Sequence, residues 1–211
     1  MKKIENFSTE QETFWAGSFG SEYISRNQGD LLLASNLKFF SDALSGTEEV
    51  ASCLEFGANI GMNLRAIRLL YPKALLNGIE INPDAAKILS EFVGESNVYH
   101  GSIFDYPVTA QFDLSLIKGV LIHINPDMLS KVYQKLYEAS KRYILVCEYY
   151  NPSPVTINYR GHTDRLFKRD FAGEMLDLYP DLKLIDYGFA YRRDPSFPQD
   201  DITWFLMEKK G

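Results

Sequence analysis

The stretch from Val50 to Asn63, VASCLEFGANIGMN, constrains the fold of this chain more than any other. An apolar run ends at the acidic residue Glu55, and glycines follow at positions 57 and 61. A helix-like segment begins directly afterwards, at Leu64. A strand, a glycine turn and a helix in this order present backbone N–H groups to a ligand at the carboxyl end of a strand. The stretch therefore predicts an α/β fold with a ligand site at this turn.

The spacing of the glycines separates three kinds of site. A dinucleotide fingerprint, G-x-G-x-x-G, is disfavoured because Asn59 and Met62 occupy the places of its second and third glycines. A P-loop is disfavoured because no Gly-Lys-Ser/Thr follows at the required distance. The remaining pattern resembles the first motif of class I S-adenosylmethionine (SAM) methyltransferases, E/D-x-G-x-G-x-G, with Asn59 replacing the middle glycine. An ordinary strand–helix turn is the alternative. The resemblance implies cofactor contacts from Glu55, Gly57, Ala58, Asn59 and Gly61.

Two later strands end in further candidates for cofactor binding. The predicted strand from Leu75 to Ile81 ends at Glu80, whose carboxylate can accept hydrogen bonds from both hydroxyls of a ribose. After a short strand over 97–100, methyltransferases usually carry G-D-x-x-D, and the first Asp accepts the adenine amino group. Ser102 stands in that place, so we expect a weaker or water-mediated contact there. Ile81 and Ile103 are candidates to pack on the nucleoside, with ordinary core packing as the alternative reading for Ile103.

The first 45 residues are expected to form a helical cover over the cofactor. They contain an aromatic-rich stretch, and residues 31–44 show helical periodicity. Tyr23 and Arg26 lie one helical turn apart, so that a phenol and a guanidinium share one face. Such a pair can bind the methionine carboxylate through charge-assisted hydrogen bonds. A surface ion pair is the competing interpretation.

The fourth and fifth predicted strands, 112–120 and 143–150, frame the region where an acceptor would meet the methyl group. Lys118 and Gly119 end the fourth strand and are further candidates for cofactor binding. They stand in place of the Asn/Asp-Pro-Pro-Tyr/Phe motif of methyltransferases that act on bases and glutamine. His123 and Glu148 are the candidate general bases. The alternative for His123 is a structural role, as a residue at the start of a helix whose side chain bonds to the backbone. The next two residues after Glu148, Tyr149 and Tyr150, would line the acceptor pocket.

Residues 151–170 are expected to form a long loop, and long loops in compact domains are usually functional. The segment is basic although the whole chain is acidic, and arginine side chains fit carboxylate and phosphate groups. The pattern favours an anion site for the acceptor over a solvated charged loop. The residues in question are Tyr159, Arg160, His162, Arg165, Lys168 and Arg169.

Two long strands, 182–191 and 202–208, close the chain without an intervening helix. The sequence therefore predicts a Rossmann-like class I methyltransferase fold. Its sheet would have seven mostly parallel strands ending in an antiparallel hairpin, with helices on both faces. We expect one domain over 1–211, consisting of the cover (1–45), a cofactor-binding core (46–150), and the acceptor loop with the C-terminal hairpin (151–211).

Several long segments resemble the pseudaminic acid biosynthesis-associated methylases. The resemblance implies SAM as cofactor, S-adenosylhomocysteine as product and methyl transfer to O or N of a small anionic acceptor. That acceptor would be a nonulosonic-acid-type sugar, free or nucleotide-linked. Methyl transfer to a protein or another metabolite, and SAM binding without catalysis, remain open. The segments are FWAGSFGSEYISRN (14–27), EFGANIGMNLRA (55–66), GIEINPDAA (78–86), IKGVLIHINPD (117–127), EYYNPSPV (148–155), YRGHTDRLFKRDFAGE (159–174) and DDITWFLMEK (200–209).

Composition narrows the partners. The net charge of −6 over 211 residues argues against a broad nucleic-acid-binding face. No apolar run reaches membrane-spanning length and no secretory leader is recognisable, so we expect no membrane partner. Cys53 and Cys147 fall inside predicted strands as free thiols, which fits a reducing cytoplasm. The three histidines and two cysteines lack the spacing of metal ligands, so no metal is expected.

Overall fold

A seven-stranded sheet organises the computed structural model, which describes residues 7–159 and 162–210, with only the backbone of 158, 159 and 162–165. Within the described residues β9 runs antiparallel to its neighbours β5 and β8, and the other pairings from β3 to β5 are parallel. The order is β3-β2-β1-β4-β5-β9-β8, which confirms the predicted fold class. The strands are β1 (Ser52–Phe56), β2 (Leu75–Glu80), β3 (Val98–His100), β4 (Phe112–Lys118), β5 (Ser140–Glu148), β8 (Leu182–Ala190) and β9 (Ile202–Lys209).

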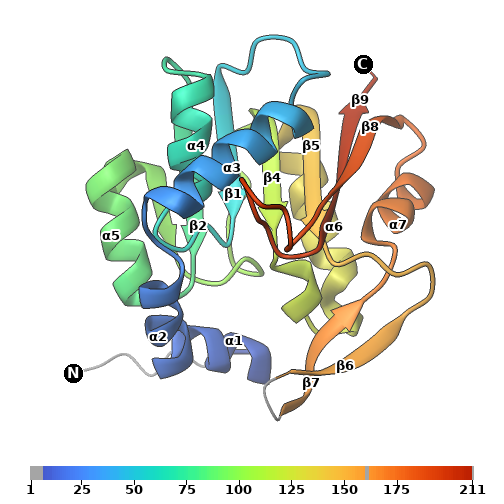
Figure 1. The fold of residues 1–211 in the computed structure, drawn as a ribbon. Coiled ribbons are helices and arrows are strands. Elements are labelled where there is room, and N and C mark those ends of the chain that lie inside the picture. Colours follow the sequence, from blue (N-terminus) through green and yellow to red (C-terminus); the bar gives the residue numbers. More distant parts are fainter. Residues whose placement is uncertain (1–6, 160–161, 211) are drawn as a thin grey trace.

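Helices pack on both faces of this sheet (Figure 1). One core lies under α3 (Asp30–Ala43), α4 (Met62–Leu70) and α5 (Pro83–Val93). A second core lies under α6 (Leu129–Ala139) and α7 (Phe171–Leu178). Because the central strands are covered on both sides, they are apolar almost without interruption rather than alternating. Across the described residues, no helix combines the length and apolar character needed to cross a membrane.

The expected N-terminal cover divides into two parts. Helices α1 (Glu10–Ala16) and α2 (Ser18–Arg26) lie at the end of the sheet where the parallel strands finish (Figure 1). In contrast α3 belongs to the core, because Phe39 and Phe40 are buried in the cluster on the α4 face. The chain enters α1 through a capping box, in which Thr9 and Glu12 satisfy each other's backbone N–H groups.

Asn82 joins the two cover helices to the core. Its Oδ1 caps α5 by accepting hydrogen bonds from two backbone N–H groups of the first turn, at 3.1 Å each. Its Nδ2 donates to the carbonyl oxygens of Trp15 and Gly17, both at 3.2 Å. This close approach requires Gly20, where an added Cβ would lie 2.0 Å from the Trp15 carbonyl oxygen. One side chain therefore begins a core helix and fixes the position of the cover.

The connection after β4 consists of two short turns. The 3-10 turns η2 (Leu121–His123) and η3 (Pro126–Met128) precede α6. Asn125 caps η3 by accepting a hydrogen bond from the Asp127 N–H at 3.0 Å, and α6 starts only at Leu129.

Residues 151–170 are not the long loop that the sequence suggested. They form an antiparallel hairpin of β6 (Val155–Tyr159) and β7 (His162–Lys168), which Figure 1 shows projecting from the main sheet. The strand β7 contacts η2, and Leu166 and Phe167 are buried there. The prediction of a loop was wrong because the two segments pair with each other, and the apolar side chains Leu166 and Phe167 near the end of β7 pack on the core.

Candidate functional site

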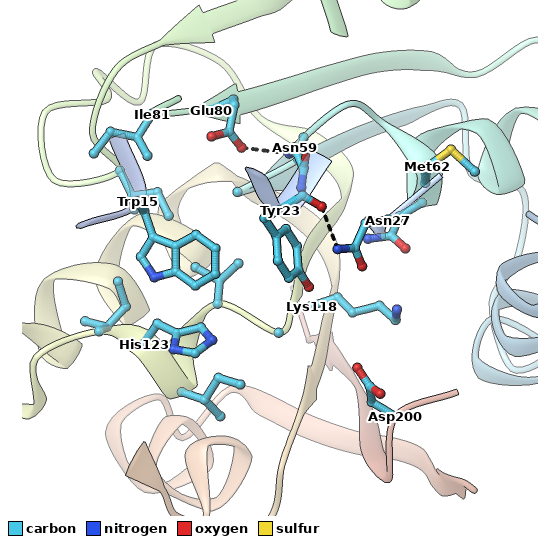
Figure 2. A pocket seen from close by; sticks show the side chains of 18 of the residues that line it. Trp15, Tyr23, Asn27, Asn59, Met62, Glu80, Ile81, Lys118, His123 and Asp200 are labelled. Atoms are coloured by element: carbon cyan, nitrogen blue, oxygen red, sulfur yellow. Dashed lines mark hydrogen bonds between the residues drawn. The ribbon is translucent and has the colours of Figure 1, made fainter. Parts of the chain in front are cut away.

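A cavity of about 670 Å³ lies where β1, β2 and β4 end. The cover helices close it on one side, and the loop between β8 and β9 closes it on another. Figure 2 shows side chains from these separate elements pointing into one space. All predicted cofactor-binding residues line the cavity except Glu55 and Gly61. Those that line it are Tyr23, Arg26, Gly57, Ala58, Asn59, Glu80, Ile81, Ser102, Ile103, Lys118 and Gly119.

The glycine turn has the left-handed backbone that its sequence requires. Gly57 has φ of 76° and Gly61, which precedes α4, has φ of 81°. Asn59 takes φ of 49°, a conformation that asparagine tolerates better than most residues because its side chain can bond locally. Its Oδ1 accepts a hydrogen bond from the Ile60 N–H at 2.7 Å. Asn59 therefore replaces the middle glycine without breaking the turn.

Glu80 is held in place by the backbone around it. Its two carboxylate oxygens accept hydrogen bonds from the N–H groups of Asn59 and Asn82, each at 2.7 Å. Burial raises the pKa of Glu80, and these backbone N–H groups oppose that rise. A carboxylate offers about four lone-pair positions, so both oxygens keep capacity for a donor in the cavity. A pair of neighbouring hydroxyls, as in a ribose, fits this arrangement.

Glu55 and Gly61 lie beneath the cavity and do not line it. Glu55 is fully buried, and its Oε1 accepts a hydrogen bond from Asn63 Nδ2 at 2.6 Å. Burial raises the pKa of Glu55 to about 8, so its carboxyl group is largely protonated at neutral pH. At Gly61 an added Cβ would lie 2.8 Å from a methyl carbon of Leu89. Both residues support the turn from below, while Gly57, Ala58, Asn59 and Ile60 line the cavity.

Lys118 links three walls of the cavity. Its Nζ donates to Gln199 Oε1 at 3.2 Å, and Gln199 Nε2 donates to Asn36 Oδ1 at 2.8 Å. Burial lowers the pKa of Lys118, while nearby acidic groups, Asp200 among them, oppose the change. Asn36 and Gln199 could not be predicted from the sequence, because 163 positions separate them and neither belongs to a motif.

The two candidate bases have different surroundings. His123 lines the cavity, is only 8% exposed, and its ring centre lies 4.8 Å from that of Trp15. Glu148 does not line the cavity, because its Oε1 accepts hydrogen bonds from the N–H groups of Val120 and Leu121 at 2.9 and 2.8 Å. Burial raises the pKa of Glu148 to about 7. The geometry makes Glu148 an anchor for η2, which in turn carries His123.

The predicted acceptor residues are only partly assembled at the cavity. Tyr149 lines it, and Lys168 places its ammonium 5.1 Å from the centre of the Tyr149 ring. Tyr150 is 42% exposed and its ring packs against Phe205 instead. Arg169 Nε donates to Glu174 Oε1 at 2.5 Å, so this arginine belongs to an internal ion pair. Arg160 and the side chains of Tyr159, His162 and Arg165 lie outside the described residues.

Several cavity residues come from the cover and were not singled out from the sequence. Trp15, Asn27 and Glu12 all line the cavity, and Figure 2 shows the Trp15 ring beside His123. The sequence signal was the aromatic-rich stretch around Trp15. Its rings form a partly exposed cluster on the cover, with Trp15 edge-on to Tyr23 at 5.3 Å between ring centres. In the part of the chain that is described, no His, Cys, Asp or Glu residues group as metal ligands would.

Comparison with solved structures places this geometry among known folds. The fold is similar to 1,6-didemethyltoxoflavin-N1-methyltransferase of Burkholderia thailandensis, which was solved with S-adenosylhomocysteine bound. The TM-score is 0.70 at 13% identity, with 95% of this chain and 87% of that one covered. Magnesium protoporphyrin IX methyltransferase of Synechocystis PCC 6803, also with S-adenosylhomocysteine, gives 0.66 at 12% identity, covering 95% and 100%.

A third similar structure is mitomycin 7-O-methyltransferase, with a TM-score of 0.67 at 15% identity. The match covers 96% of this chain, which spans only 61% of that protein. Neither a scan of family models nor a search of curated proteins gives a match to this sequence. The chain therefore has the fold of class I SAM-dependent methyltransferases, and the names of these three similar enzymes give chemically different acceptors.

Proposed function

We propose that this protein is a SAM-dependent methyltransferase that acts on O or N of a small acceptor. The observation that carries the proposal is the convergence of the glycine turn, Glu80 and Lys118 on one cavity at the ends of β1, β2 and β4. In open α/β sheets ligands bind at the carboxyl ends of the strands. The volume of about 670 Å³ lies within the roughly 300–1,000 Å³ of small-molecule sites.

The residues present suit SAM. Glu80 retains acceptor capacity for the two ribose hydroxyls, and the turn at Gly57 keeps the backbone open to a close ligand. Arg26, whose guanidinium lies 5.8 Å from the centre of the Tyr23 ring, would receive the methionine carboxylate together with Tyr23. When bound, SAM supplies an electrophilic methyl group on a positively charged sulfur.

His123 is the proposed general base. It lies just beyond β4 at the cavity wall, and Glu148 holds its turn through two backbone N–H groups. Its imidazole would take the proton from an acceptor hydroxyl as the oxygen attacks the methyl group, or from a protonated amine before the nitrogen attacks. Trp15 and Tyr149 would orient the acceptor beside it, and the cover helices would exclude water.

We propose further that the acceptor is an anionic sugar of the nonulosonic-acid type, free or nucleotide-linked, as the resemblance to the pseudaminic acid-associated methylases implies. Two cationic side chains support an anionic ligand, since Lys118 lines the cavity and the Lys168 ammonium lies 5.1 Å from the centre of the Tyr149 ring. Arg192 also lines the cavity but pairs with Asp201. The two buried free cysteines fit a reducing compartment, and we propose the cytoplasm. A protein or other metabolite as acceptor, and SAM binding without catalysis, are the alternatives.

The test is incubation with SAM labelled in its methyl group and a panel of nonulosonates, free and nucleotide-linked, followed by mass spectrometry. Proteins and neutral sugars serve as competing acceptors in the same panel. We expect a labelled product and a matching amount of S-adenosylhomocysteine with an anionic sugar. Binding of SAM without substrate-dependent S-adenosylhomocysteine across all acceptors would favour the non-catalytic alternative. Failure to bind SAM in calorimetry would overturn the proposal.

A further inference from the structure

One end of the cavity is formed jointly by the core and the cover. Strand β3 pairs with β2 on the side away from β1, so the loop that follows β3 lies beyond Glu80. A nucleoside whose ribose bonds to Glu80, with its sulfur end towards the glycine turn, places its base at this loop. Two apolar side chains, Ile81 and Ile103, line this end and suit the faces of a flat base. The polar group that meets the edge of the base then decides which base is accepted.

The polar group here is a carboxylate from α1. Ser102 is 4% exposed and its Oγ accepts a hydrogen bond from the Phe104 N–H at 3.1 Å. The same hydroxyl donates its proton to Glu12 Oε1, which makes Ser102 the support of the Glu12 side chain. The other oxygen, Oε2, accepts from the Thr9 N–H at 2.8 Å. Glu12 is 7% exposed, lines the cavity, and is held rigidly from both sides.

The chemistry of adenine matches this carboxylate. Its 6-amino group is a donor and needs an acceptor, and a charged acceptor gives the stronger bond. The Ser102 hydroxyl has already committed its proton to Glu12 and one acceptor position to Phe104. Among the described residues Glu12 Oε1 accepts a hydrogen bond from Ser102 alone, so it retains a lone pair for a donor in the cavity.

We infer that Glu12, in the cover helix α1, accepts the adenine 6-amino group and selects adenosine over nucleosides that carry a 6-oxo group. The inference rests on the proposed function, because it assumes that SAM occupies the cavity. It makes Glu12 a specificity-determining residue, positioned by Ser102. The base is then recognised by a residue of the cover rather than by one in the loop after β3.

The test compares binding of S-adenosylhomocysteine and S-inosylhomocysteine by calorimetry. In the inosyl compound a carbonyl oxygen replaces the 6-amino group, so it repels a carboxylate. The wild type should bind the adenosyl compound at least tenfold more tightly, as expected for one charge-assisted hydrogen bond. Glu12→Gln should narrow or reverse this ratio, because the glutamine amide can donate to the carbonyl oxygen. Glu10→Gln, which removes a charge from the exposed side of the same helix, should keep the wild-type ratio.

A second variant separates recognition from helix capping, since Glu12 also closes the capping box with Thr9. Glu12→Ala should weaken adenosyl binding and lose the preference. Adding Ser102→Asp to Glu12→Ala returns a carboxylate to the same end of the cavity and should restore the preference. If Glu12→Gln weakens both compounds equally and leaves their ratio unchanged, Glu12 only caps α1 and the inference is overturned while SAM binding stands. If the wild type binds neither compound, the proposed function falls as well.

Discussion

Glu55 should make the free energy of unfolding depend on pH, because its burial changes its pKa between the folded and unfolded states. The side chain is fully buried, Asn63 donates to Oε1, and Oε2 has no hydrogen-bond partner among the described residues. Burial raises the pKa of Glu55 from 4.5 to about 8 in the folded protein. A folded-state pKa above the unfolded one means that the native state binds the proton more tightly. The contribution of protonated Glu55 to the free energy of unfolding is therefore at its full value below about pH 4.5. It is lost progressively as the pH rises to about 8.

The size of the loss follows from the shift. One pKa unit corresponds to about 1.4 kcal/mol, so a rise from 4.5 to about 8 corresponds to about 4–5 kcal/mol of unfolding free energy. Glu55→Gln keeps the shape of the side chain but cannot ionise. The variant should therefore lack this part of the pH dependence, and its advantage over the wild type should grow as the pH rises. Asn63 Nδ2 keeps an acceptor in the glutamine carbonyl oxygen.

The assay is urea unfolding of both proteins at intervals from pH 5 to pH 9, with the free energy of unfolding extrapolated to water. Burial also raises the pKa of Glu148 to about 7, and of Glu80, but both groups are present in the two proteins. The difference between wild type and variant therefore isolates Glu55. Two curves that stay parallel from pH 5 to pH 9 would refute the reasoning, because they would mean that Glu55 does not titrate in this window.

Three further experiments address the site. Glu80→Ala should weaken SAM binding by roughly 1.5–3 kcal/mol through loss of charged hydrogen bonds. Unchanged affinity in calorimetry would contradict the proposal that Glu80 binds the ribose hydroxyls. Asn59→Gly should relax the left-handed backbone and raise the melting temperature but weaken SAM binding; tighter binding would show that Asn59 is merely tolerated. Arg165→Ala should lower kcat/KM for an anionic acceptor roughly ten- to a hundredfold and leave the SAM affinity unchanged. The matched control is Arg169→Ala, which breaks the ion pair with Glu174. This control should lower the melting temperature and keep normal acceptor kinetics.

Local patterns were sufficient to predict the sheet and several residues at the base of the cavity. The apolar run before Gly57 and the run that ends at Glu80 each predict a buried parallel strand, and both strands form at these positions, with Gly57 and Glu80 lining the cavity. Glu55 shows where such patterns stop. The motif places an acid near the turn, but only packing decides that its side chain is directed beneath the turn towards Asn63 rather than into the cavity.

Contacts between distant segments could not be predicted in the same way. Glu12 and Ser102 are 90 positions apart, and nothing in either local sequence indicates that the two side chains are in contact. The sequence showed that Ser102 lacks a carboxylate but not that α1 brings one. The hairpin of β6 and β7 was missed for a related reason, since its strands are stabilised by pairing and by contact with η2 rather than by a buried run of their own.

The length of the cover helices determines how the cavity opens. Helix α1 has 7 residues and α2 has 9, and isolated helices shorter than about 12–15 residues are marginal in water. Detached from Asn82 and the core, they would lose their helical structure, so opening is a local unfolding event rather than the swing of a rigid lid. A ligand that enters by displacing this segment would then have to refold it, and part of the ligand's intrinsic affinity would be spent on ordering it. Amide hydrogens of α1 and α2 should exchange quickly in the free protein and slowly once the cavity is filled.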